Sequence, residues 1–179
     1  MDFNQIPGAF PRAHYCIDVG WDFLEEHLAR CTDQGFTADP DFQRAHVWTE
    51  AQQAAYVEYM LRGGEVSRAL IVNAPRWHLD GYTHSALVDG KQRMEAVRRF
   101  MRNELPVFGG HFLRDFTGNM RMVNARFQWN VISMPDRARL LDLYLSINAG
   151  GTPHSAEEIA RVRGMRDSLA GGAKWMNGK

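Results

Sequence analysis

The strongest constraint on the fold is a change of hydrophobic period at Asp89-Gly90. The apolar pair at 87–88 predicts the end of a buried strand. After the glycine, apolar residues recur at the spacing of one helix face, at Met94, Val97 and Met101. A strand must therefore pass into a helix through a tight polar turn at this point.

This turn is suited to holding an anion. The first turn of a helix has backbone N–H groups without partners and carries partial positive charge, and Gly90 lets a ligand approach the main chain. Lys91 and Arg93 add two cations, and the planar guanidinium of Arg93 matches a phosphate. An ordinary turn followed by a solvated basic helix face explains these residues equally well.

Length and composition indicate an ordinary globular protein. The 179 residues fit one domain, predicted over residues 14–170, with an N-terminal arm at 1–13 and a C-terminal tail at 171–179. The hydrophobic fraction of 45% and charged fraction of 23% are typical of soluble proteins. No apolar run approaches the ~20 residues of a membrane span, and no signal sequence begins the chain. These features predict a cytoplasmic protein without membrane contact.

Charge and cysteine usage disfavour several classes of function. Lys plus Arg and Asp plus Glu both number 21, so DNA binding would require a local basic patch. Cys16 and Cys31 lie far apart without a C-x-x-C motif, which disfavours a zinc ribbon and predicts two reduced, packed thiols. The seven histidines form no H-x-x-x-H pair, and we assign no metal to them.

The periodicity predicts an alternation of strands and helices. Strands are predicted at 14–19, 66–73, 84–88 and 125–131. Helices are predicted from Trp21 to Arg30, from the capping box Thr49–Gln52 to Arg62, through Met94 to Met101, through Leu141 to Leu145, and from the capping box Ser155–Glu158 to Gly171. A loop with an exposed Trp77 joins the second and third strands. In the helix at 50–62, Ala54, Val57 and Leu61 are predicted to face the core and Glu58 the solvent.

The segment at 40–48 is a dense aromatic and polar mixture with no clean period. We expect Phe42, Val47 and Trp48 to pack inward, which leaves Gln43, Arg44 and His46 in need of partners or a ligand. A semi-buried arginine here can serve as a structural ion-pair partner or contact a ligand near the Asp-Gly turn.

A second glycine-containing segment, Asn148 to Thr152, lies between two predicted helices. Gly150 and Gly151 allow backbone amides to turn toward an anion, and Asn148 tolerates left-handed conformations. The same composition also makes a good helix terminus.

Three stretches in this order resemble the family of domains with an Asp-Gly-Gln-Gln-Arg signature, found in GmrSD-type modification-dependent restriction enzymes and as free-standing phage and prophage proteins. They are Asp41-Phe42-Gln43-Arg44 through Trp48, Val88-Asp89-Gly90-Lys91-Gln92-Arg93, and Ile147-Asn148-Ala149-Gly150-Gly151-Thr152. The resemblance extends from Tyr15 to Arg166. It implies an α+β domain of the ParB/sulfiredoxin fold, with a small mixed sheet and flanking helices.

The resemblance also implies a nucleotide site. The phosphates of ATP or another nucleoside triphosphate would be held by Gly90, Lys91, Gln92 and Arg93, with Arg44 and the segment Asn148 to Thr152 at the same pocket. Related proteins on this fold bind or hydrolyse nucleoside triphosphates, and some are nucleases.

This chain departs from the family at two positions. Lys91 stands where the family commonly has Gln, and Ser146 stands where many members have an arginine that would contact a phosphate. Sulfiredoxin has its reactive cysteine at the position of Lys91, so a reductase of that kind is excluded.

Three functions therefore compete. In the first, the domain binds a nucleoside triphosphate. Hydrolysis would follow if Asp89 holds Mg²⁺ or orients water while Arg93 neutralises phosphate charge. Alternatively, Asp89 only caps the turn. In the second, local arginines bind DNA without turnover, namely Arg93, Arg98, Arg99 and Arg102 on one helix and Arg161, Arg163 and Arg166 on another. Glu95 and Glu104 interleave with the first set. In the third, the domain inhibits a host or phage protein.

Overall fold

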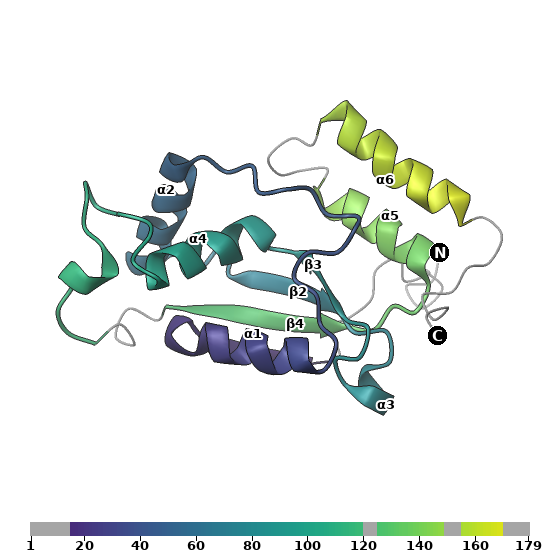
Figure 1. Cartoon of the computed structure of the whole chain (residues 1–179), viewed down its shortest axis with the longest axis horizontal. Coiled ribbons are helices and arrows are strands. Elements are labelled where there is room, and N and C mark those ends of the chain that lie inside the picture. Colours follow the sequence, from purple (N-terminus) through teal and green to yellow (C-terminus); the bar gives the residue numbers. More distant parts are fainter. Residues whose placement is uncertain (1–14, 120–124, 149–154, 170–179) are drawn as a thin grey trace, which may run out of the picture.

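The computed structural model describes residues 15–119, 125–148 and 155–169. A four-stranded sheet lies at its centre in the order β1-β4-β2-β3 (Figure 1). The strands are β1 (Tyr15–Gly20), β2 (Ala69–Asn73), β3 (Ala86–Asp89) and β4 (Arg126–Ile132). β4 pairs antiparallel with β1 and parallel with β2, whereas β2 and β3 are antiparallel. The predicted α+β class with a small mixed sheet is confirmed.

Helices flank the sheet. They are α1 (Leu24–Asp33), α2 (Glu50–Leu61), α3 (Trp77–Asp80), α4 (Lys91–Met101), α5 (Arg137–Asn148) and α6 (Ala156–Ser168), with short 3-10 turns at Trp21–Phe23 and Leu113–Asp115. Both predicted capping boxes are present: the side chain of Thr49 accepts a hydrogen bond from the Gln52 amide, and that of Ser155 from the Glu158 amide. No helix within the described ranges is long and apolar enough to cross a membrane.

Two apolar clusters hold these elements together. The alternation along β4 places Phe127, Trp129 and Val131 in the larger cluster, with residues of α1, α2 and α4. The smaller cluster joins Phe42, Val88 of β3 and the inner residues of α5 and α6. Figure 1 shows α5 and α6 lying together beside the β3 end of the sheet. The segment from Phe42 to Trp48 contacts both clusters, because Phe42 belongs to the smaller one and Trp48 packs against the larger one.

Two predicted strands, at 66–73 and 84–88, begin at Ala69 and Ala86, later than expected by more than one residue. A residue with left-handed backbone precedes each one, Ser67 (φ 66°) before β2 and His84 (φ 57°) before β3. Extended pairing cannot continue through such a residue. Val66, predicted in the strand, is consequently 72% exposed.

Several side chains occupy other environments than predicted. Trp77 lies on α3 and stacks on Tyr15 with ring centroids 5.0 Å apart, so it is not exposed. Glu58 is not simply solvated, because its Oε1 accepts a hydrogen bond from the Phe108 amide at 2.6 Å. Cys16 is exposed on the edge strand β1, so the prediction of packing holds for Cys31 but not for Cys16.

The core face of α2 is also rotated from the prediction. Gln53, Tyr56, Val57 and Met60 are buried, whereas Ala54 and Leu61 lie at the margin of the cluster. Two of the buried residues are polar-tipped and can reach partners at the edge of the core. The predicted arm and tail lie outside the described residues.

A buried histidine predicts a pH dependence of stability. Burial among aromatic rings, and next the charge of Arg30, lowers the pKa of His27 below its ordinary value. The unfolded chain therefore binds this proton more readily. The contribution of His27 to stability is full above the ordinary pKa of about 6.5 and is lost as pH falls from there through the lowered pKa of the folded state. In urea unfolding between pH 5 and 8, His27→Leu should show a shallower loss of stability toward low pH. An unchanged slope would contradict this assignment.

Candidate functional site

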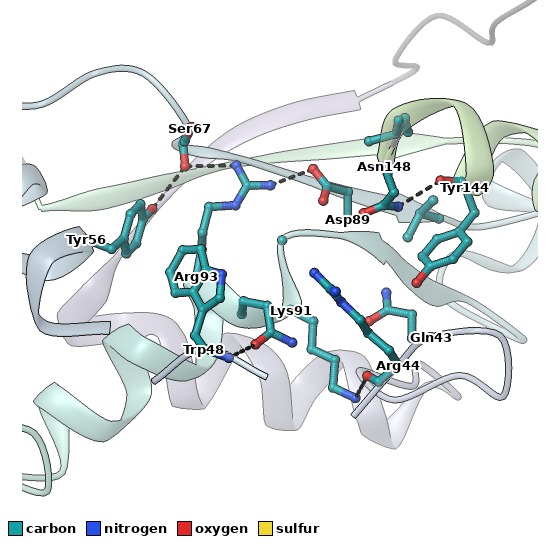
Figure 2. Close-up of a pocket in the computed structure, with 14 residues that line it drawn as sticks. Gln43, Arg44, Trp48, Tyr56, Ser67, Asp89, Lys91, Arg93, Tyr144 and Asn148 are labelled. Atoms are coloured by element: carbon teal, nitrogen blue, oxygen red, sulfur yellow. Dashed lines mark hydrogen bonds and ion pairs between the residues drawn. The ribbon is translucent and has the colours of Figure 1, made fainter. Parts of the chain in front are cut away.

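One pocket brings together the three segments singled out in the sequence. A cavity of about 280 Å³ lies among the end of β3, the N-terminus of α4, the 43–48 segment, α2 and the end of α5 (Figure 2). Its walls include Arg44, the whole turn Asp89 to Arg93, and Asn148. Gly150, Gly151 and Thr152 lie outside the described residues.

Gly90 makes the turn at the pocket floor possible. Its backbone has φ 103° and ψ 7°, a left-handed conformation that glycine adopts without strain. A Cβ at this position would overlap the side chain of Leu70 on β2. Any larger residue here would have to displace this fully buried leucine side chain.

The N-terminus of α4 faces the pocket without a side-chain cap. Its N-cap is Gly90, which has no side chain, and its first turn has no acidic residue. α2 and α6, in contrast, begin with capping boxes and have glutamates in the first turn. The helix dipole at this end of α4 is thus available to a bound anion.

Arg93 and Asp89 form an ion pair at the pocket wall. Arg93 Nη2 donates to Asp89 Oδ2 at 2.5 Å, and Nη1 donates to the Ser67 carbonyl at 3.0 Å. The Tyr56 hydroxyl donates to the same carbonyl at 3.0 Å. The side chains of Arg93 and Asp89 are only 14% and 27% exposed, so the pair fixes both groups.

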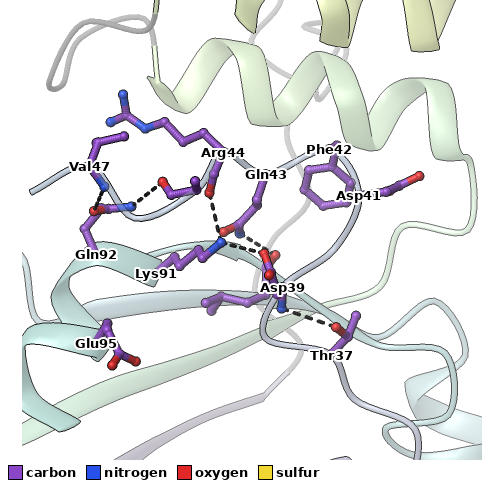
Figure 3. A network of polar contacts seen from close by, with 12 residues as sticks. Thr37, Asp39, Asp41, Phe42, Gln43, Arg44, Val47, Lys91, Gln92 and Glu95 are labelled. Atoms are coloured by element: carbon purple, nitrogen blue, oxygen red, sulfur yellow. Dashed lines mark hydrogen bonds and ion pairs between the residues drawn. The ribbon is translucent and has the colours of Figure 1, made fainter. Parts of the chain in front are cut away.

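Lys91 and Gln92 line the pocket and also clamp the 43–48 segment, a role the sequence did not predict. Lys91 Nζ donates to Asp39 Oδ1 at 2.5 Å and to the Arg44 carbonyl at 2.9 Å (Figure 3). Gln92 Oε1 accepts from the amides of Val47 and Trp48, and its Nε2 donates to the Ala45 carbonyl. An irregular segment needs such partners for its backbone groups.

The clamped segment presents Arg44 to the pocket. Its side chain is 12% exposed, and Figure 2 shows it directed into the cavity. Nη1 lies 3.9 Å from Glu158 Oε2, which is at the limit of an ion pair. On one side of Arg44, Gln43 Nε2 donates to the Leu87 carbonyl at 2.7 Å. On the other, Val47 is 44% exposed, so its predicted inward packing is wrong.

Aromatic side chains form the apolar walls. Trp48 and Tyr56 lie on one side with ring centroids 5.6 Å apart, and Tyr144 lies on the other. Burial raises the pKa of both tyrosines, so their hydroxyls remain protonated at neutral pH. Sequence reasoning missed Tyr56, Tyr144 and Ser67. A tyrosine on the core face of a helix needs a polar partner for its hydroxyl. This requirement could have drawn attention to Tyr56 and Tyr144 from the sequence.

The end of α5 closes the pocket. The side-chain amide Nδ2 of Asn148 donates to the Tyr144 carbonyl, four residues earlier, at 2.8 Å. This bond holds the Asn148 side chain against the last turn of α5 at the cavity wall. Ser146, which stands where the family resemblance implies an arginine, is exposed and donates to the Asp142 carbonyl. It does not line the pocket.

The pocket residues that the structure describes offer few ligands for a resident metal ion. Among the described residues, no three His, Cys, Asp or Glu side chains gather where they could hold a metal. Asp89 is the one acidic residue that the structure describes in the pocket wall, and it is paired with Arg93. Mg²⁺ binds through one or two carboxylates plus substrate phosphates, so it would have to arrive with a nucleotide.

The arginines of α4 and its C-cap residue Arg102 that lie outside the pocket are ion-paired. Arg98 pairs with Glu25 and Glu95, Arg99 with Glu50, and Arg102 with Glu95 and Glu104. The hydrogen bond with Glu25 is the main cause that raises the pKa of Arg98. DNA phosphates would compete with these carboxylates.

The arginines of α6 differ from one another. Arg166 pairs with Asp142 and Asp167, Arg161 donates to backbone carbonyls, and Arg163 is exposed.

No family model, curated protein or solved structure gives a significant match to this chain.

Proposed function

We propose that this pocket binds a nucleoside triphosphate, with its phosphates against the Gly90 turn and the N-terminus of α4. One observation carries the proposal. Arg44 and Arg93, far apart in sequence, both line a cavity that also contains an uncapped helix N-terminus. Guanidinium groups and helix N-termini both favour phosphate, and here they converge.

The pocket walls support a nucleotide over inorganic phosphate. Trp48 is the partly exposed aromatic side chain of this lining and is the one on which a base can stack, whereas Tyr56 and Tyr144 are almost fully buried behind the surface of the cavity. The cavity of about 280 Å³ is near the lower end of ligand pockets, so part of the ligand would extend beyond it. The meeting of the three motifs also supports a finer proposal, that the fold is ParB/sulfiredoxin-like.

Binding is better supported than hydrolysis. Hydrolysis requires a group positioned to activate water. Asp89 is the candidate, but its carboxylate already accepts a hydrogen bond from Arg93. We therefore propose a binding domain, with phosphate release in the presence of Mg²⁺ as the measurement that would extend the proposal to an NTPase.

The test is a thermal-shift and calorimetry panel of ATP, GTP, ADP and triphosphate, each with and without Mg²⁺. A nucleotide at about 100 times its Kd should raise the Tm by roughly 5 to 10 °C. Arg44→Ala should weaken binding about 10- to 100-fold, because a hydrogen-bonded charge contact is lost. Arg139→Ala, an exposed arginine on α5, is the matched control and should bind as wild type does.

The panel also separates the alternatives. If no nucleotide stabilises the wild type, the proposal is wrong. Stabilisation by duplex DNA alone, with an affinity that falls steeply with salt, would point instead to a nucleic-acid-binding module.

A further inference from the structure

The segment at 41–48 is held from two sides, and Arg44 lies between them. Downstream of Arg44, Gln92 binds the backbone of Ala45, Val47 and Trp48. Upstream, the partners come from β3, where the Leu87 carbonyl accepts from Gln43, and from α5 and α6. Figure 3 shows this segment running between α4 and the α5 side of the molecule.

Arg161 of α6 supplies most of the upstream contacts. Its Nη1 donates to the Asp41 carbonyl at 2.8 Å, and its Nη2 donates to the carbonyls of Phe42 at 2.9 Å and Gln43 at 3.4 Å. One guanidinium therefore holds three successive carbonyls directly before Arg44. A lysine ammonium lacks the planar fork that allows this arrangement.

The helix that carries Arg161 is itself firmly placed. Val162, the next residue, is buried in the smaller apolar cluster together with Phe42 and Tyr144. Arg137 of α5 binds the Asp41 carboxylate at 2.5 Å. α6 thus gives Arg161 a fixed position from which to orient the segment.

We propose that Arg161 is a positioning residue that sets the direction of Arg44 in the pocket. The inference rests on the proposed nucleotide function, which it deepens by coupling α6 to the site. Without Arg161, the three carbonyls turn to water and the backbone before Arg44 gains freedom. A binding group such as the Arg44 guanidinium loses much of its contribution to ligand affinity when it is displaced by about 1 Å.

A double-mutant cycle tests the coupling. Arg161→Ala should weaken nucleotide binding about tenfold, and Arg161→Lys should restore only part of it. In the Arg44→Ala background, Arg161→Ala should change the affinity less than about twofold, because the group it positions is gone. Arg163→Ala, an exposed arginine on the same helix, is the control and should bind normally.

Hydrogen exchange without ligand provides an independent measurement. Amides at 44–48 should exchange faster in Arg161→Ala but not in Arg163→Ala, while those of β2 and β4 stay protected. A tenfold loss that persists in the Arg44→Ala background, wild-type binding by Arg161→Ala, or unchanged exchange at 44–48 would each overturn the inference. Absence of nucleotide binding by the wild type would overturn the proposed function, and exchange would still decide whether Arg161 orders the segment.

Discussion

Gly90→Ala is expected to destabilise the protein by about 3 kcal/mol and to lower its Tm by roughly 10 °C. Two effects add. Alanine is strained at φ 103°, and its Cβ would overlap the side chain of Leu70, which is fully buried on β2. Because the turn also forms the pocket floor, nucleotide binding should be lost in the same variant. Thermal unfolding and calorimetry measure both effects.

Gly109→Ala separates the two causes. Gly109 also has a left-handed backbone, with φ 83°, but a Cβ there would meet nothing within 4 Å. Its substitution should cost only the backbone strain, on the order of 1 kcal/mol. Equal losses in the two variants would show that contact with Leu70 is unimportant.

Of the variants considered, Phe42→Ala should have the largest effect on stability. We expect a loss of about 3 to 5 kcal/mol in the free energy of unfolding. Phe42 is completely buried, and its ring meets that of Tyr144 at a centroid distance of 5.2 Å. The substitution leaves a cavity in the smaller cluster and removes the apolar anchor of the segment that carries Arg44. Urea unfolding measures the loss.

Val47→Ala is the matched control for this prediction. Val47 belongs to the same segment but is 44% exposed, so its truncation should change stability by less than about 0.5 kcal/mol. A comparable loss in both variants would contradict the assignment of Phe42 as the anchor.

Features determined by neighbouring residues were predicted well from the sequence. The capping boxes at Thr49 and Ser155 depend on side chains three positions apart, and the period change at Asp89-Gly90 marks the junction of β3 and α4. The failures at Val66 and at Trp77 have another origin. A left-handed residue delays the start of β2, and the environment of Trp77 is set by Tyr15, a residue distant in sequence.

Among the described residues, the sequence pointed to several that line one pocket, but not to the contacts between them. Arg44, Asp89 to Arg93 and Asn148 do line one pocket. The sequence offered Lys91 only as a phosphate ligand, whereas it also holds Asp39 and the carbonyl of Arg44. A cation and a carboxylate 52 positions apart give no periodic signal, so only the folded arrangement reveals their pairing.

The double clamp on the 41–48 segment has a consequence for the order of folding. The hydrogen bonds that hold this segment join residues 44 to 120 positions apart in the sequence. They are made by the side chains of Gln43, Lys91, Gln92 and Arg161. Forming such contacts closes long loops, which costs chain entropy. The contacts offset this cost only after their distant partners are in place. The pocket should therefore assemble after the β2–β3 hairpin and the α5–α6 pair. A molecule able to bind ligand would then be one that has finished folding.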